Sequence, residues 1–352
     1  MQDIVEKITM IQPSFFDTEN RLKKLNEKDN LLKLNKLIDW EQFRSTLELA
    51  RNNKPRKSNA GRKSFDSVLM FKCLILQHLY NLSDEELEFQ LRDRLTFMRF
   101  VGLKPEDTTP DCNTLWDFRE FLTTTNTLKP LFEIFTAHLN AQGFTAKKGQ
   151  IIDASFVEAP RQRNTREQND VIKQGLVPAE FAENPAVQSQ KDLDARWAKK
   201  NNAVHYGYKN HINIDAGHKI IRDFSCTSAE VHDSNEFETL LTSNSNQNVW
   251  ADSAYRSNEK EMILDILGYK SQVHKKGTRA KPLTEKQTLE NTKKSKIRAR
   301  VEHVFGHIKN SLKGNFVRVI GVARATAKIT LTNLTYNIDR FCYLQGVALS
   351  KK

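Results

Sequence analysis

Residues 295–312 read SKIRARVEHVFGHIKNSL, and the predictions for the rest of the chain start from this stretch. Apolar residues recur along it at helical spacing, which predicts an amphipathic helix with one buried stripe. The residues of the stripe are Val301, Phe305, Ile308 and Leu312.

Three charged residues lie beside this stripe. Glu302 comes four residues after Arg298 and seven before Lys309, so at 3.6 residues per turn all three project from nearly the same side. The helix therefore directs one acid, flanked by two cations, at one place. On their own, Arg298 and Glu302 also fit an ordinary solvent-exposed ion pair one turn apart.

Two acidic residues earlier in the chain favour a functional site over a surface ion pair. Asp153 follows an apolar strand start in QIIDASFVEA, and Asp252 ends a short strand in NVWADSAYRS. Carboxylates from two strands and one late helix can together hold two hard divalent cations. Asp153, Asp252 and Glu302 are therefore the candidate catalytic and metal-binding residues.

Composition narrows the class of protein. The 352 residues are enough for two domains with substantial cores, and 55 Lys and Arg against 43 Asp and Glu give a net charge of +12. This excess predicts an anionic partner, with nucleic acid the leading candidate. The four cysteines form no CxxC pair, which fits a reducing compartment and neither a disulfide framework nor a zinc site.

No segment of the sequence predicts export or membrane insertion. The first 20 residues mix acids among apolar residues, unlike a signal peptide. The most apolar segment, 68–80, is interrupted by Lys72 and is too short to span a bilayer. We therefore expect an intracellular protein without a membrane partner.

Residues 1–145 predict a helical amino-terminal domain. Asp39 and Ser83 are expected helix caps within it. A basic linker, 51–63, separates two of its helices, and Arg62 and Lys63 at its end are predicted to contact DNA phosphates, although the linker also fits a flexible solvated loop. We expect recognition of DNA ends in this domain, without a recognition helix that the sequence identifies.

Residues 146–346 predict a second domain of different character. The expected order is a strand at 147–159, a hairpin at 204–227, a helix at 231–244, and then alternating strands and helices. This order predicts a mixed α/β sheet flanked by helices, with acids on its first and fourth strands and on a late helix. A polar insertion, 160–202, interrupts the domain, and its Lys199 and Lys200 suit a surface that tracks a DNA strand.

Taken together, these segments resemble the DDE transposases of bacterial insertion sequences, particularly the group typified by insertion sequence five. The resemblance covers nearly the whole chain. It rests on residues 61–103 and on IIDASFVEAP, DLDARWAKKNNAVHYGYKNHINID, TSAEVHDSNEF, WADSAYRS and RARVEHVFGHIK. It implies a ribonuclease H-like catalytic domain whose triad is Asp153, Asp252 and Glu302, with two Mg²⁺ ions that Mn²⁺ can replace.

Related transposases carry a Tyr-x2-Arg-x3-Glu-x6-Lys signature around the last acid. Arg298, Glu302 and Lys309 match it here, whereas Ser295 stands at the tyrosine position. Arg298 and Lys309 are therefore expected to grip DNA phosphates. Tyr255 and Arg256, just past the second acid, are predicted to do likewise.

The resemblance implies an enzyme that cleaves DNA at the ends of its own element and joins the resulting 3′-OH ends to target DNA. The implied partners are double-stranded DNA and a second copy of the chain in a synaptic complex, in the bacterial cytoplasm at the nucleoid. Two alternatives remain open: a transposase-derived DNA-binding regulator without catalysis, and a Mg²⁺-dependent nuclease of the same fold.

Overall fold

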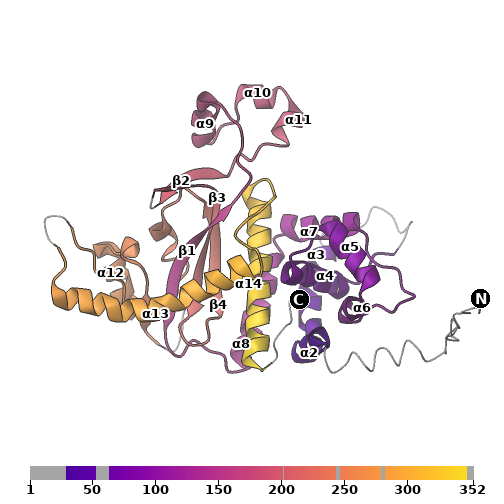
Figure 1. The fold of residues 1–352 in the computed structure, drawn as a ribbon, viewed down its shortest axis with the longest axis horizontal. Coiled ribbons are helices and arrows are strands. Elements are labelled where there is room, and N and C mark those ends of the chain that lie inside the picture. Colours follow the sequence, from indigo (N-terminus) through magenta and orange to yellow (C-terminus); the bar gives the residue numbers. More distant parts are fainter. Residues whose placement is uncertain (1–28, 53–62, 201, 243–245, 279–281, 347–352) are drawn as a thin grey trace, which may run out of the picture.

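The computed structural model describes residues 29–52, 63–200, 202–242, 246–278 and 282–346 (Figure 1). Its amino-terminal part is entirely helical. The elements are α2 (Asn30–Leu37), η1 (Trp40–Phe43), α3 (Arg44–Asn52), α4 (Ser67–Tyr80), α5 (Asp84–Asp93), α6 (Leu95–Val101), α7 (Cys112–Thr124) and α8 (Leu128–Ala141). Both predicted caps are confirmed, because Asp39 caps the 3₁₀ turn η1 that leads into α3, and Ser83 caps α5.

The described part of the second half forms one six-stranded mixed sheet. Its strands are β1 (Gln150–Glu158), β2 (Arg196–Lys200), β3 (Ala203–Asp215), β4 (Ile221–Ser228), β5 (Asn248–Trp250) and β6 (Lys270–Ser271). The long strand β3 pairs antiparallel with β1, β2 and β4, whereas β1, β5 and β6 run parallel. The predicted hairpin is confirmed as β3 and β4.

The polar insertion, 160–202, has more structure than its sequence predicted. It contains α9 (Arg166–Lys173), α10 (Ala179–Ala182) and α11 (Pro185–Gln188), which project from the sheet in Figure 1, and then β2. Because β2 is short, polar and mostly exposed, it has no apolar alternation by which a strand is predicted. In chain order Asp252 therefore follows the fifth strand, β5. The prediction that this acid belongs to the fourth strand was wrong.

Three further helices and two 3₁₀ turns complete the fold. They are η2 (Asp233–Glu236), η3 (Ser253–Tyr255), α12 (Asn258–Ile266), α13 (Glu285–Asn310) and α14 (Val322–Leu344). The helix predicted from residue 295 is confirmed as the second half of α13. The prediction of a helix at 231–244 was wrong. The described part of this segment contains only the 3₁₀ turn η2, in which the Asp233 carboxylate pairs with Lys209 at 2.7 Å.

The helices cover the sheet and share its core. In Figure 1, α13 crosses the sheet, and α14 stands between the sheet and the amino-terminal helices, with contacts to β4, α4, α7 and α8. One buried apolar cluster runs from Phe71 in α4 through Ile212 in β3 to Leu334 in α14. A mixed sheet flanked by helices and preceded by an all-α region is the predicted ribonuclease H-like fold.

The described helices also bear on the membrane prediction. None of them is long and apolar enough to cross a bilayer.

Candidate active site

The pairing of β1 with β5 places two of the predicted acids on neighbouring segments of the chain. The parallel register aligns Ile151 with Trp250. Asp153 and Asp252 each follow that pair by two residues in the same chain direction, Asp153 within β1 and Asp252 just beyond the end of β5. Asp252 caps η3, where its carboxylate accepts a hydrogen bond from the N–H of Ser253.

Helix α13 brings the third acid to the same place. It packs across both β1 and β5. The guanidinium of Arg298 lies 2.8 Å from Oδ2 of Asp153 and 3.4 Å from Oε1 of Glu302. One cation therefore bridges the first and third predicted acids, and the pairing of Arg298 with Glu302 is part of this site.

The surroundings of Asp153 disfavour its negative charge. Its side chain is 13% exposed, and this burial raises the pKa of Asp153 to about 6. The N–H of Ala154, at 2.9 Å, and the charges of Arg298 and Lys200 oppose the shift, while Glu302 adds to it. A buried carboxyl of this kind gains from a further cation beside it.

The three acids supply hard oxygen ligands, which suit Mg²⁺ or Mn²⁺. Within the described ranges, however, no three His, Cys, Asp or Glu side chains form a group that could hold a metal ion. The oxygens of Asp153 instead accept hydrogen bonds from Arg298 and from the N–H of Ala154. The three carboxylates therefore fit a divalent cation in their chemistry, but the structure does not gather them into one metal-binding group.

Tyr255 lies beneath these acids, away from the surface. It is 1% exposed, and its ring packs against Phe237 with 5.6 Å between centroids. Burial raises the pKa of Tyr255 well above its ordinary value, and the negative charges of Asp153, Asp233 and Asp252 act in the same direction. Its hydroxyl is buried and has no hydrogen-bond partner among the described residues, so contact with DNA would require this loop to open.

The other predicted DNA-binding residues are spread more widely. Lys200 and Lys199 are exposed at the end of β2, Lys309 is exposed near the end of α13, and Lys63 precedes α4. Arg256 pairs with Glu261 at 3.6 Å. Arg62 lies outside the described residues. Among these cations, Arg298 directly contacts Asp153 and Glu302, and the positive charge of Lys200 lowers the pKa of Asp153.

Sequence analysis missed His274, which follows β6. Its backbone N–H bonds the carbonyl of Ala251 at 3.2 Å, and its ring nitrogen lies 3.4 Å from the hydroxyl of Ser295. Burial lowers the pKa of His274; the charge of Arg298 also lowers it, while that of Asp252 opposes the shift. The parallel pairing of β5 with a two-residue strand places His274 here, and so short a strand leaves only a weak signal in the sequence.

Comparison with known proteins identifies the family of this chain. Residues 145–338 match the family described as "Transposase DDE domain". The chain belongs to the DDE transposase family. Residues 19–121 match a second family, "Transposase domain (DUF772)". As a DDE transposase, the chain is an enzyme that acts on DNA, and its family uses divalent metal ions.

One solved structure is similar to this DDE transposase. It is a cryo-EM structure of the piggyBac transposase synaptic complex with hairpin DNA. The match covers 89% of this chain and 76% of that chain, at 12% sequence identity and a TM-score of 0.41.

Proposed function

We propose that this DDE transposase, of the insertion sequence five group, cleaves DNA at the ends of its element and joins the 3′-OH ends to target DNA. The observation that supports the proposal is the contact of one cation with two of the predicted acids. Arg298 lies 2.8 Å from Asp153 and 3.4 Å from Glu302, and Asp252 follows β5, the parallel neighbour of β1. These three carboxylates form the proposed catalytic triad.

The reaction has two phosphoryl transfers. In the first, water attacks a phosphodiester at the element end, and the bond to the 3′-oxygen breaks, leaving a 3′-OH. In the second, that 3′-OH attacks a target phosphodiester and displaces a target 3′-oxygen. Two bound Mg²⁺ ions, or Mn²⁺ in their place, would activate the attacking oxygen and neutralise charge on the leaving one.

The proposed roles of the acids follow from their positions. Asp153, Asp252 and Glu302 would hold the metal ions through their carboxylate oxygens. Arg298 forms an ion pair with Asp153 at 2.8 Å. Arg298 is also a proposed contact to a DNA phosphate.

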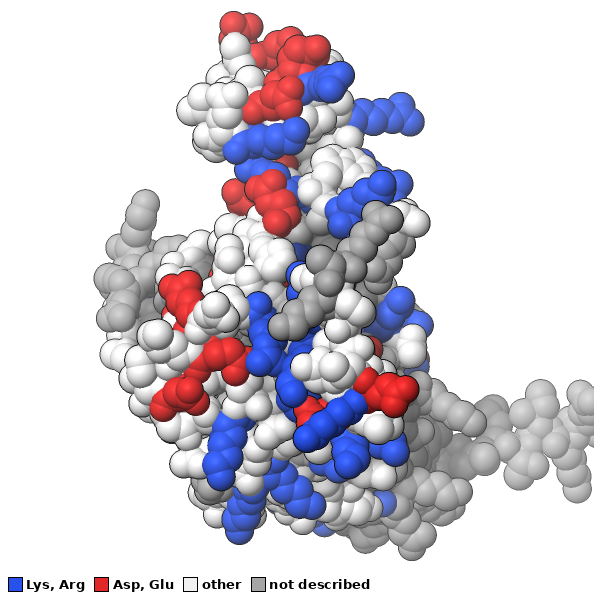
Figure 2. All heavy atoms as spheres, turned by 90° about the vertical axis from the view of Figure 1, so that its left-hand side faces the viewer, with Lys and Arg blue, Asp and Glu red and all other residues white. Residues whose placement is uncertain are grey.

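The DNA surface is proposed to follow α13. This helix carries seven Lys and Arg residues against three Glu, which gives its exposed surface a positive charge. Figure 2 shows Lys and Arg side chains, in blue, across the body of the molecule below the part formed by α9, α10 and α11. Lys309, Arg256, Lys199 and Lys200 are the proposed phosphate contacts beside Arg298.

Recognition of element ends is proposed to lie in residues 1–145. Within them, the linker 51–63, including Lys63, is proposed to contact DNA phosphates. Residues 146–346 carry catalysis. Joining two ends requires them to be held together, so the proposed working form is a homodimer in a synaptic complex, acting at the nucleoid in the bacterial cytoplasm.

A plasmid assay tests this function. Wild-type protein is incubated with Mg²⁺, a supercoiled target plasmid and duplexes from the DNA flanking the coding region, where inverted repeats mark the element ends. We expect joined products from wild type. Asp153→Asn should abolish cleavage and joining while still shifting end DNA in a gel, because it removes a metal ligand and leaves the basic surface.

A matched control is Asp265→Asn, which makes the same chemical change at an exposed position of α12 and should leave both reactions intact. Activity of Asp153→Asn would reject the triad. Nicks without joining would indicate the nuclease, and binding without nicks the regulator.

A further inference from the structure

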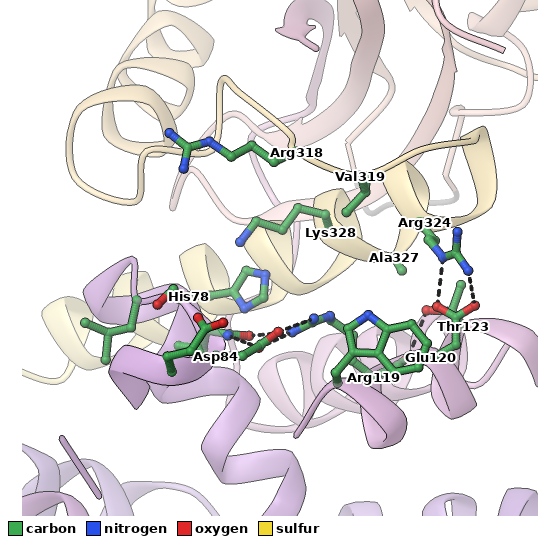
Figure 3. Close-up of a pocket in the computed structure, with 15 residues that line it drawn as sticks. His78, Asp84, Arg119, Glu120, Thr123, Arg318, Val319, Arg324, Ala327 and Lys328 are labelled. Atoms are coloured by element: carbon green, nitrogen blue, oxygen red, sulfur yellow. Dashed lines mark hydrogen bonds and ion pairs between the residues drawn. The ribbon is translucent and has the colours of Figure 1, made fainter. Parts of the chain in front are cut away.

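A cavity of about 270 Å³ lies between the amino-terminal helices and the end of the catalytic domain (Figure 3). Helices α4, α5 and α7 form one wall, and α14 with the segment before it forms the other. This volume is below the usual range for drug-sized ligands, so the cavity suits a small group.

Two cations in this cavity lack a counter-ion. Lys328 projects from α14, and Arg318 extends from the preceding segment toward the same side in Figure 3. Within the described residues, neither side chain forms a hydrogen bond or an ion pair through its charged group. The charged groups of Lys328 and Arg318 are therefore not occupied by an ion pair within the described residues.

The acids in the cavity are largely neutralised by other cations. Arg119 binds the two oxygens of Asp84 through bonds of 2.7 Å each. Arg324 binds Glu120 through bonds of 2.9 and 2.8 Å. The remaining acid, Glu85, is exposed at the cavity edge.

The surroundings of Lys328 make its charge costly without an anion. Burial lowers the pKa of Lys328 to about 8, the nearby charge of Arg119 lowers it further, and Asp84 opposes the shift. His78, on the opposite wall, is also buried, which lowers its pKa well below the ordinary value. At neutral pH the cavity thus holds a charged lysine beside a neutral histidine.

We propose that this cavity binds a phosphate group through Lys328 and Arg318, and that the backbone of bound DNA supplies it. A phosphate offers the negative charge and the acceptor oxygens that the two cations lack. Only the source of the phosphate rests on the proposed function. The cavity would give the protein a DNA anchor formed jointly by both domains, apart from the triad.

The test measures binding of a duplex from the DNA flanking the coding region over a range of salt concentrations. The test protein is Lys328→Met combined with Arg318→Gln, in the full chain. Its methionine fills similar space without a buried charge, so the variant should fold. The control is Lys104→Met, which removes an exposed lysine after α6.

We expect the double variant to reduce the magnitude of the negative slope of log K against log[salt] by about 1, the value for one lost phosphate contact. The control should keep the wild-type slope. A second measurement compares melting temperatures in inorganic phosphate and in chloride at equal ionic strength, where phosphate should stabilise wild type more than the double variant.

Each outcome decides the proposal. A reduced slope assigns the cavity to a DNA phosphate. Phosphate-specific stabilisation with an unchanged slope assigns it to a free phosphate anion. If neither changes, there is no phosphate site. Failure of wild type to nick or join DNA would count against the proposed function alone, because these measurements require no catalysis.

Discussion

His211 lies in the middle of β3 and is fully buried. Its Nε2 lies 2.8 Å from the hydroxyl of Thr227 on β4. Burial lowers the pKa of His211 to about 4, against the opposing charges of Asp233 and Glu236, while Lys209 adds to the shift. The folded protein therefore keeps this imidazole neutral at a pH where an unfolded chain would protonate it.

This residue predicts a pH dependence of stability. Between pH 6.5 and 4 the unfolded chain binds a proton at His211 that the folded chain excludes, so acid favours unfolding. His211→Gln removes that proton. Between pH 7 and pH 5 we expect the variant to lose about 2 kcal/mol less unfolding free energy than wild type.

Urea denaturation at the two pH values measures this difference. His303→Gln, at an exposed position of α13, is the control and should follow wild type. An equal loss in wild type and His211→Gln would show that the histidine does not titrate in this way.

For single residues, the sequence predicts contacts within one element but not contacts between residues that are far apart in the chain. The charged side of α13 is set by helical periodicity, so Arg298 and Glu302 could be predicted to lie together. That Arg298 binds Asp153, 145 positions away, depends on the folded sheet. Tyr255 follows Asp252 closely in sequence, which favoured a DNA contact, yet the chain turns its ring into the core.

At the scale of elements, the pairing of β1 with β3 depends on Gly207. Its backbone has a φ of 141°, and a Cβ there would lie 2.5 Å from the carbonyl oxygen of Val157 and 2.7 Å from the nitrogen of Ala159. Both neighbours are backbone atoms at the end of β1, so they have little room to move. Only glycine permits this approach without strain.

Gly207→Ala should therefore destabilise the protein by roughly 2–4 kcal/mol. Because β1 carries Asp153, plasmid cleavage should fall as well. Gly306→Ala in α13 is the matched control: its added methyl meets nothing within 4 Å, and alanine favours a helix by about 0.8–1 kcal/mol. Unfolding free energies that change equally in the two variants would contradict this account of the strand pair.

The elements themselves were predictable where their pattern is local. The stripe of α13, the caps of α5 and η1, and the β3–β4 hairpin all have signals within a few residues. Strand β2 does not, because its polar sequence becomes a strand only by pairing with β3. The 3₁₀ turn η2 was predicted as part of a longer helix because its structure also depends on a distant contact. Its Asp233 forms an ion pair with Lys209 of β3.

At the scale of the molecule, α14 joins the two halves. It packs on the amino-terminal helices α4, α7 and α8 and on strands β3 and β4. The large buried cluster includes Leu74 of α4, Leu331 of α14 and Ile214 of β3. Division of the chain near residue 145 would expose this apolar surface to water, at about 25 cal/mol per Å².

We therefore expect the metal-free chain to unfold in one calorimetric transition, with the van't Hoff enthalpy equal to the calorimetric enthalpy. Leu331→Ala deletes a fully buried side chain from α14 and should cost about 2–5 kcal/mol, which lowers the temperature of the whole transition. Leu49→Ala makes the same change at a residue that is 63% exposed and should have little effect. Two separate transitions, only one of them shifted by Leu331→Ala, would mean that the halves fold independently and that α14 belongs to one of them.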